Sequence, residues 1–332
     1  MKRILLDGAL PFYKANMHCH TTNSDGKMTP EQIKAHYMAN GYQIVAFTDH
    51  EHILDNSYLN EEGFLALTGC EIAIKEIKHL SSGQKRDMKV CHLNLYAKDP
   101  HNVDTPCYSI VADHFLNPSI ADKIVHSTPD YDRTYSHEGI SEIIREANSR
   151  GFLVSYNHPR WSLENARDYL GYEGLWAMEI YNHTAFTDGY PDYNLHAYED
   201  FLRDGKRIGC VMGDDNHEMS TTVGAMTYFN APELTYGAIV DAMLQHRFYC
   251  SQGPLIHSLS VDGLTATIEF SEADTVLLSP RGRGVQKKVF EDEGRHTATF
   301  TFRPDDGYIR FDVISRSGKR AHTCAYFLDE LV

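Results

Sequence analysis

His18 and His20 stand two residues apart in the stretch Asn16-Met17-His18-Cys19-His20-Thr21-Thr22-Asn23-Ser24-Asp25-Gly26, and Phe47-Thr48-Asp49-His50 follows further along the chain. In an extended strand, residues two apart point to the same face, so the two imidazoles can bind one cation. Among 19 histidines in 332 residues, about one such pair is expected by chance. The order of the motifs, H-x-H, then S-D-G, then T-D-H, makes the stretch a candidate metal site.

The segment between these motifs predicts the helix and strand of a β-α-β unit. Residues 29–32, Thr-Pro-Glu-Gln, have the pattern of a capping box with proline at the first helical position, and Gly41 suits a left-handed helix end. The apolar run 42–47 is typical of a strand buried on both faces of a parallel sheet. The two histidine motifs then lie at the ends of successive strands, where the active sites of β/α barrels are found.

Further predicted strands also present acidic or histidine side chains, with helices expected at 138–150 and 193–204. These side chains are Glu71 after the run 64–70, His92 within 89–96, His158 after 151–157, Glu179 within 177–182, and Asp215 and His217 after 207–212. The alternative for each is an ordinary surface carboxylate or a satisfied histidine. His92 in particular lies between apolar neighbours and could donate to a backbone carbonyl.

The ordered set H-x-H, S-D-G, T-D-H, G-x-E, H, N-H-P and D-x-H resembles the motifs of the PHP superfamily, named for polymerase and histidinol phosphatase domains. The sequence motifs N-x-H-x-H-T-T-x-S-D-G and D-D-N-H also resemble those of the carbaryl hydrolase-like branch of this superfamily. The resemblance implies an α/β fold, a distorted (β/α)7 TIM-like barrel, with two or three divalent transition metals, Zn, Mn or Fe.

By the same resemblance, particular residues hold each metal. The first metal would be held by His18, His20, Glu71 and Asp215, the second by Glu71, His92 and His158, and the third by Asp25, His50 and His217. Many relatives have histidine where Asp25 stands, and a carboxylate still ligates zinc or manganese. Asp215 is preferred to Asp214 because the family spacing is D-x-H.

The predicted catalytic residues are Glu71, His158 and Arg160. Glu71 can bridge two metals, and His158 holds the second of them. Arg160 directly follows His158-Pro159, and its guanidinium matches phosphate or carboxylate oxygens, so it is a candidate substrate clamp. The alternative for Arg160 is an exposed side chain without a partner.

Composition restricts the partners. A net charge of −15 disfavours nucleic acid, because binding to phosphate backbones depends on Lys and Arg. Bound cations would reverse the sign locally, so a small anionic substrate is expected. No apolar run approaches the ~18 residues of a membrane span, and Asp7 interrupts any signal-peptide pattern at residues 1–8. An odd number of scattered cysteines favours free thiols and a cytoplasmic location.

The pattern changes after Gly253-Pro254. Short alternating runs separated by Gly, Asp and Pro predict a small all-β, sandwich-like domain at 254–332, following a metallohydrolase barrel at 1–253. Residues 75–88 and 99–136 show little periodicity and are interpreted as long insertions at the barrel mouth. The sequence makes no prediction of the oligomeric state.

The leading hypothesis is a metal-dependent hydrolase, a phosphoesterase acting on a small phosphomonoester or phosphodiester through a metal-bound hydroxide. One alternative is hydrolysis of a carbamate, amide or carboxylic ester at the same site, which the resemblance of the motifs to the carbaryl hydrolase-like branch suggests. Another is a non-catalytic, metal-stabilised protein whose C-terminal domain binds a partner. The intact set of candidate ligands argues against this last hypothesis.

Overall fold

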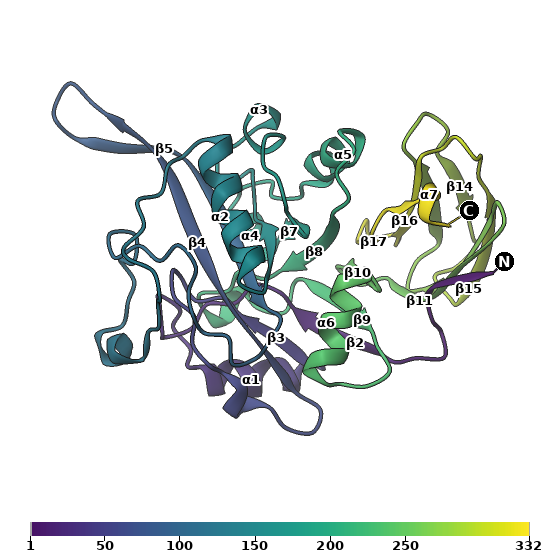
Figure 1. The fold of residues 1–332 in the computed structure, drawn as a ribbon. Coiled ribbons are helices and arrows are strands. Elements are labelled where there is room, and N and C mark those ends of the chain that lie inside the picture. Colours follow the sequence, from purple (N-terminus) through teal and green to yellow (C-terminus); the bar gives the residue numbers. More distant parts are fainter. Residues whose placement is uncertain (1, 332) are drawn as a thin grey trace.

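The computed structural model describes residues 2–331, and a large mixed sheet runs through it (Figure 1). In spatial order, its strands are β14 (Gln286–Val289), β13 (Thr275–Pro280), β16 (Tyr308–Ile314), β17 (Arg320–Thr323), β10 (Phe248–Ser251), β9 (Met226–Asn230), β2 (Phe12–Asn16), β3 (Ile44–Phe47), β4 (Leu65–His79), β5 (Lys85–Ala97), β6 (Phe152–Tyr156), β7 (Ala177–Asn182) and β8 (Gly209–Gly213). Strands β2, β3 and β4 are parallel, as are β6, β7 and β8, whereas β5 is antiparallel to both neighbours.

Helices alternate with the strands of the first part of the chain. They are α1 (Pro30–Ala39), α2 (His137–Ser149), α3 (Ala166–Tyr169), α4 (His183–Thr187), α5 (Leu195–Arg203), α6 (Tyr236–Leu244) and, near the C-terminus, α7 (Leu328–Leu331). Helix α1 begins at the predicted capping box, in which Thr29 and Gln32 each accept the other's backbone N–H, and Gly41 has φ of +74° beyond its end. The mixed α/β class is confirmed, and closure of the sheet into a (β/α)7 barrel stays a prediction.

The segment interpreted as an insertion at residues 75–88 is a β-hairpin instead. Strands β4 and β5 stay paired as far as His79 and Lys85, and the hairpin projects from the body of the fold in Figure 1. Its outer residues are exposed on both faces, so no apolar alternation marked them as strands in the sequence. As a consequence, Glu71 and His92 lie in the middle of long strands and not at strand ends.

The C-terminal part is all-β, as predicted. Strands β1 (Arg3–Leu6), β11 (Leu255–Asp262), β12 (Thr265–Ser271) and β15 (His296–Thr301) form a second sheet, and β18 (Tyr326–Phe327) pairs with β16. A separate apolar core that includes Leu259, Ile268 and Phe311 lies among these strands. Strand β1, from the N-terminal end of the chain (Figure 1), pairs with β11 of the C-terminal part, and β17 of the C-terminal part pairs with β10. Strand pairing therefore joins the two regions on either side of the predicted boundary at residue 253.

A buried charge network joins β16 to helix α5. Arg310 is 2% exposed and forms ion pairs with Asp312 on its own strand and Glu199 on α5. Burial raises the pKa of the Asp312 carboxyl, but Arg310 and His322 outweigh that effect and hold the pKa well below its usual value. The stabilisation from Asp312 is therefore present above its unfolded pKa of roughly 3.9 and is lost as the pH falls below that value.

Arg310→Met is expected to lower the free energy of unfolding by about 3–5 kcal/mol, because Asp312 would stay buried without its cation. Arg316→Met is the matched control. Arg316 is 56% exposed and pairs with Asp274 at 3.0 Å, so its loss should change stability by less than about 1 kcal/mol. Urea unfolding followed by circular dichroism measures both variants, and equal losses would contradict the assignment of the network.

Within residues 2–331, no helix is both long and apolar enough to cross a bilayer. The seven cysteines are buried, and none forms a disulfide.

Candidate metal centre

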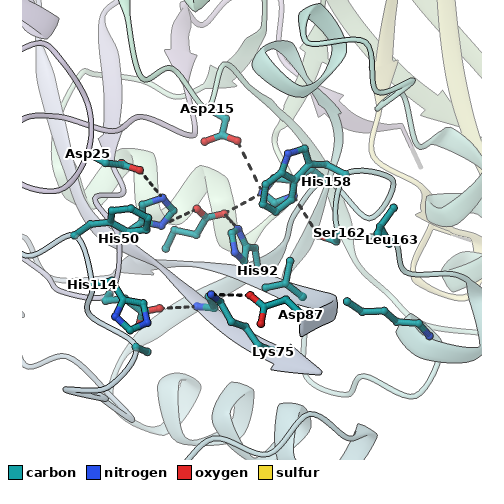
Figure 2. A pocket seen from close by; sticks show the side chains of 18 of the residues that line it. Asp25, His50, Lys75, Asp87, His92, His114, His158, Ser162, Leu163 and Asp215 are labelled. Atoms are coloured by element: carbon teal, nitrogen blue, oxygen red, sulfur yellow. Dashed lines mark hydrogen bonds and ion pairs between the residues drawn. The ribbon is translucent and has the colours of Figure 1, made fainter. Parts of the chain in front are cut away.

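The predicted ligand residues, scattered along the sequence, lie together in the structure. His18 and His20 follow β2, Asp25 lies in the next loop, His50 follows β3, Glu71 and His92 lie in β4 and β5, His158 follows β6, and Asp215 and His217 follow β8. Figure 2 shows the side chains of Asp25, His50, His92, His158 and Asp215 directed toward one another. The sheet thus brings side chains from six strands to one place.

The ligand atoms form groups in which all atoms lie within 4.8 Å of one another. The groups are His18, His20, Glu71 and Asp215; Glu71, His92 and His158; His20, Asp25, His50 and His217; and His18, His158 and Glu179. The first two have the composition implied by the family resemblance, and the third has it with His20 added. Because His18, His20, Glu71 and His158 each belong to two groups, the groups form one connected cluster.

Glu71 occupies the centre of this cluster. Five imidazole nitrogens lie within 3.4 Å of its carboxylate, those of His18, His20, His50, His92 and His158. Asn157, the residue before His158, donates its side-chain N–H to Glu71 Oε1 at 3.0 Å. The Asn of the N-H-P motif therefore orients the carboxylate.

The donor atoms fit a cation better than they fit one another. Three buried atoms, His20 Nδ1, His92 Nδ1 and Asp215 Oδ1, make no hydrogen bond within residues 2–331, although other cluster atoms lie close to them. A buried polar atom without a partner is costly, and metal coordination is one way to satisfy it. Imidazole and carboxylate are also the ligand types that zinc, manganese and iron prefer.

The pKa shifts of the cluster residues also indicate a site for cations. Burial lowers the pKa of His20, but the neighbouring carboxylates of Asp215 and Glu71 outweigh it and raise the pKa to about 10. Burial likewise opposes a charged His158, and Glu71 nevertheless raises its pKa to about 9. Burial raises the pKa of Asp25, whereas His217 and His50 lower it to about 2. The carboxylates therefore draw positive charge into a buried space, and divalent cations would supply it.

Other acidic residues near the cluster have structural partners. Asp214 accepts hydrogen bonds from Tyr37 and from the backbone N–H groups of Val223, Gly224 and Ala225, so it faces away from the cluster, and Asp215 faces into it. Glu179 lies 3.0 Å from His18 Nδ1, where it orients the ring. Asp49 of the T-D-H motif accepts from the Thr21 backbone N–H and from the Ser24 hydroxyl, fixing the loop after His20.

Two of the predicted site residues have unusual positions. The residue before a proline favours an extended backbone, yet His158 has φ of +23°, in the left-handed region. Such strain persists only where the surroundings hold it, here with His158 Nε2 at 3.1 Å from Glu71. Arg160 is exposed and does not line the cavity above the cluster.

That cavity, of about 400 Å³, has walls that the sequence did not predict. Its apolar walls include Met88, Phe115, Trp161, Leu163 and Tyr190. The Trp161 ring lies 5.3 Å from that of His92 and 5.2 Å from that of His158, and the Phe115 ring lies 5.0 Å from that of His50. Trp161 directly follows Arg160, so its closeness in sequence to the N-H-P motif could have predicted a place near the site. Phe115 lies in the aperiodic segment 99–136, where no sequence feature indicated a role in the site.

No family model and no curated protein matches the chain, whereas several solved structures do. A two-domain protein containing a predicted PHP-like metal-dependent phosphoesterase from Bacteroides vulgatus ATCC 8482 is 15% identical, with 97% of this chain and 96% of that chain covered and a TM-score of 0.48. A putative metal-dependent phosphoesterase from Bifidobacterium adolescentis ATCC 15703 is 18% identical, with 63% and 89% covered and a TM-score of 0.37.

A third structure is the lesion-specific endonuclease PfuEndoQ from Pyrococcus furiosus, which is 14% identical, with 70% of this chain and 56% of that chain covered and a TM-score of 0.42. Of the three, the Bacteroides vulgatus protein is the one whose description names PHP, the superfamily that the motifs resemble. None of the three is described as a carbaryl hydrolase. Identities this low support no transfer of activity or substrate to this chain.

Proposed function

We propose that the protein is a metal-dependent hydrolase, a phosphoesterase acting on a small phosphate ester. The observation that supports this most is the connected set of imidazole and carboxylate groups around Glu71, at the base of a cavity large enough for a small molecule. When bound there, two or three Zn, Mn or Fe ions would polarise the phosphoryl oxygens and activate water. No serine or cysteine nucleophile is required.

Charge favours an anionic substrate. Asp25, Glu71, Glu179 and Asp215 contribute four negative charges to the proposed site. Two divalent cations would neutralise these charges and three would leave about +2, so a site filled with three cations would attract phosphate although the chain as a whole is acidic. The same argument gives no preference to a neutral carbamate or carboxylic ester.

The chain's own residues would bind and orient the reactants. Glu179 and Asn157 fix the rings and carboxylate of the cluster, and Trp161 and Phe115 cover its open side and exclude water from the substrate's apolar part. Arg160 can clamp a substrate only if its side chain turns toward the cavity. Lys75 lines that cavity, where it forms an ion pair with Asp87 at 3.1 Å (Figure 2), and is the nearer candidate for an anion contact.

We further propose that residues 1–253 carry the chemistry and that 254–332 support the barrel, because all candidate ligands precede residue 253. A cytoplasmic location and a small anionic substrate belong to the same proposal. The alternative with the same metals is hydrolysis of a carbamate, amide or carboxylic ester, since an activated water attacks a polarised carbonyl equally well. Metal analysis followed by a panel of phosphoesters, aryl carbamates and carboxylic esters tests the two against each other. Hydrolysis of the carbonyl substrates alone would overturn the phosphoesterase proposal.

His158→Asn is expected to lower kcat by at least about a hundredfold while the protein keeps its fold and the metal nearest His20 and Asp215. The reason is that His158 is absent from that group. Metal content by mass spectrometry and circular dichroism accompany the kinetics. His101→Asn, at an exposed histidine paired with Asp55, is the control and should leave kcat and metal content unchanged. A His158 variant as active as the control would show that this histidine is structural.

A further inference from the structure

A second cavity meets the first at the candidate metal centre. It has a volume of about 350 Å³ and shares three wall residues, Trp161, Asp215 and His217, with the cavity described above. Trp161 therefore stands between two spaces that both reach the cluster. The second cavity is formed by α4, by the loop after β8 and by Lys27 of the loop that follows Asp25.

The walls of the two cavities differ in chemistry. The first has the apolar and aromatic side chains of Met88, Val90, Phe115 and Leu163. The second has Thr184, Thr221, Asp188 and the ion pair between Lys27 and Glu218, and its apolar part is Ala185 together with the shared Trp161. Away from the metal centre, Lys27 pairs with Glu218, so the exposed carboxylate of Asp188 gives that end of the second cavity a negative charge. That end suits a polar, uncharged or cationic group and repels a second phosphate.

From this arrangement we propose that the second cavity is a substrate subsite, and that the substrate is a phosphodiester with one flat apolar arm and one polar or cationic arm. The inference rests on the proposed phosphoesterase function and narrows it. A phosphomonoester has one organic substituent and would occupy one cavity only. A diester whose phosphorus lies at the cluster directs its two substituents apart, so each finds a cavity of matching polarity.

The reaction balances with water alone. The oxygen of water bonds to phosphorus, one P–O bond to an alcohol breaks, and the departing alcohol takes up a proton, leaving a phosphomonoester. The negative charge of Asp188 disfavours a second phosphate group at that end of the cavity. The arm that fits it is therefore an alcohol of the glycerol or amino-alcohol kind.

Three probes with one chromophore test the proposal on the full, metal-loaded chain. They are 4-nitrophenyl phosphate, its diester with choline, and bis(4-nitrophenyl) phosphate. We expect kcat/KM for the choline diester to exceed that of the monoester at least tenfold and to exceed that of the bis-aromatic diester. A monoester hydrolysed as fast as the choline diester would overturn the subsite and leave the phosphoesterase proposal standing.

Variants that fill the second cavity supply the decisive comparison. Thr221→Tyr and Asp188→Tyr place a ring in the cavity from half-buried and exposed positions, so at least one should fold. Each should lower the ratio of diester to monoester kcat/KM at least tenfold. Thr187→Tyr, on an exposed position of α4 outside the cavity, is the control and should keep the ratio. An unchanged ratio in the two cavity variants would mean that the second cavity holds only water and no part of the substrate, which would overturn the subsite.

Binding separates failure of this inference from failure of the proposed function. Trp161 borders both cavities, and the other tryptophan, Trp176, is buried, so fluorescence titration reports on the junction. The phenyl diester of phosphocholine should bind at least tenfold tighter than phenyl phosphate, and Thr221→Tyr should remove the difference. If no phosphate ester is hydrolysed but this binding difference is found, the phosphoesterase proposal fails and the subsite stands. Absence of the difference overturns the subsite.

Discussion

Replacing Glu71 by Gln should lower kcat by at least about a thousandfold and remove metal from the protein. Residues that merely orient a ligand typically change activity or affinity by 10- to 100-fold, and a carboxylate shared by two donor groups should exceed that. Glutamine keeps the size of the side chain, so its effect isolates the charge. With the carboxylate gone, five nearby imidazoles lose the anion that holds them together.

Glu76→Gln is the matched control, because Glu76 lies on the same strand and is exposed. It should keep wild-type kcat, metal content and fold. Steady-state kinetics with manganese, iron and zinc supplied in turn, together with metal analysis of each preparation, measure both variants. If Glu71→Gln keeps both its metals and more than a tenth of wild-type kcat, the cluster is not the catalytic centre.

Local signals in the sequence predicted much of what surrounds this site. The capping box at Thr29 and Gln32 and the glycine at position 41 depend on neighbours a few residues away, so helix α1 was found with its limits. Apolar runs predicted β3 and β6 because both faces of these strands are buried. The order of the histidine and carboxylate motifs along these elements then predicted which residues the fold would bring together.

What the sequence missed depends on contacts between distant segments. The outer β4–β5 hairpin is polar on both faces, so no periodicity marked it, and the antiparallel direction of β5 followed from a pairing that no local pattern encodes. Pairing of β1 with β11 joins opposite ends of the chain. Phe115 reaches the cavity from a segment without regular structure over most of its length, and its role appears only when that segment is folded over His50.

Removing the metals should abolish turnover and lower the melting temperature by about 10 °C. A ligand present at a thousand times its dissociation constant stabilises the folded state by about 4 kcal/mol, so two such metals contribute about 8 kcal/mol. In a chain of 332 residues, each kcal/mol changes the melting temperature by about 1.4 °C, which gives a total of about 10 °C. The expected loss is this large because the donors are buried. Once the cations leave, protonated His20 and His158 must balance the carboxylates in a largely buried space, and unpaired atoms such as His20 Nδ1 remain unsatisfied.

Differential scanning fluorimetry before and after treatment with a chelator measures this change. Returning manganese, iron or zinc should restore both stability and activity, whereas magnesium or calcium should not, because imidazole nitrogens are poor ligands for those two ions. Glu71→Gln should melt at nearly the same temperature with and without chelator, and Glu76→Gln should respond as the wild type does. A wild-type melting temperature that is indifferent to the chelator, in protein shown by metal analysis to have lost its metals, would mean that the cluster does not couple cation binding to folding.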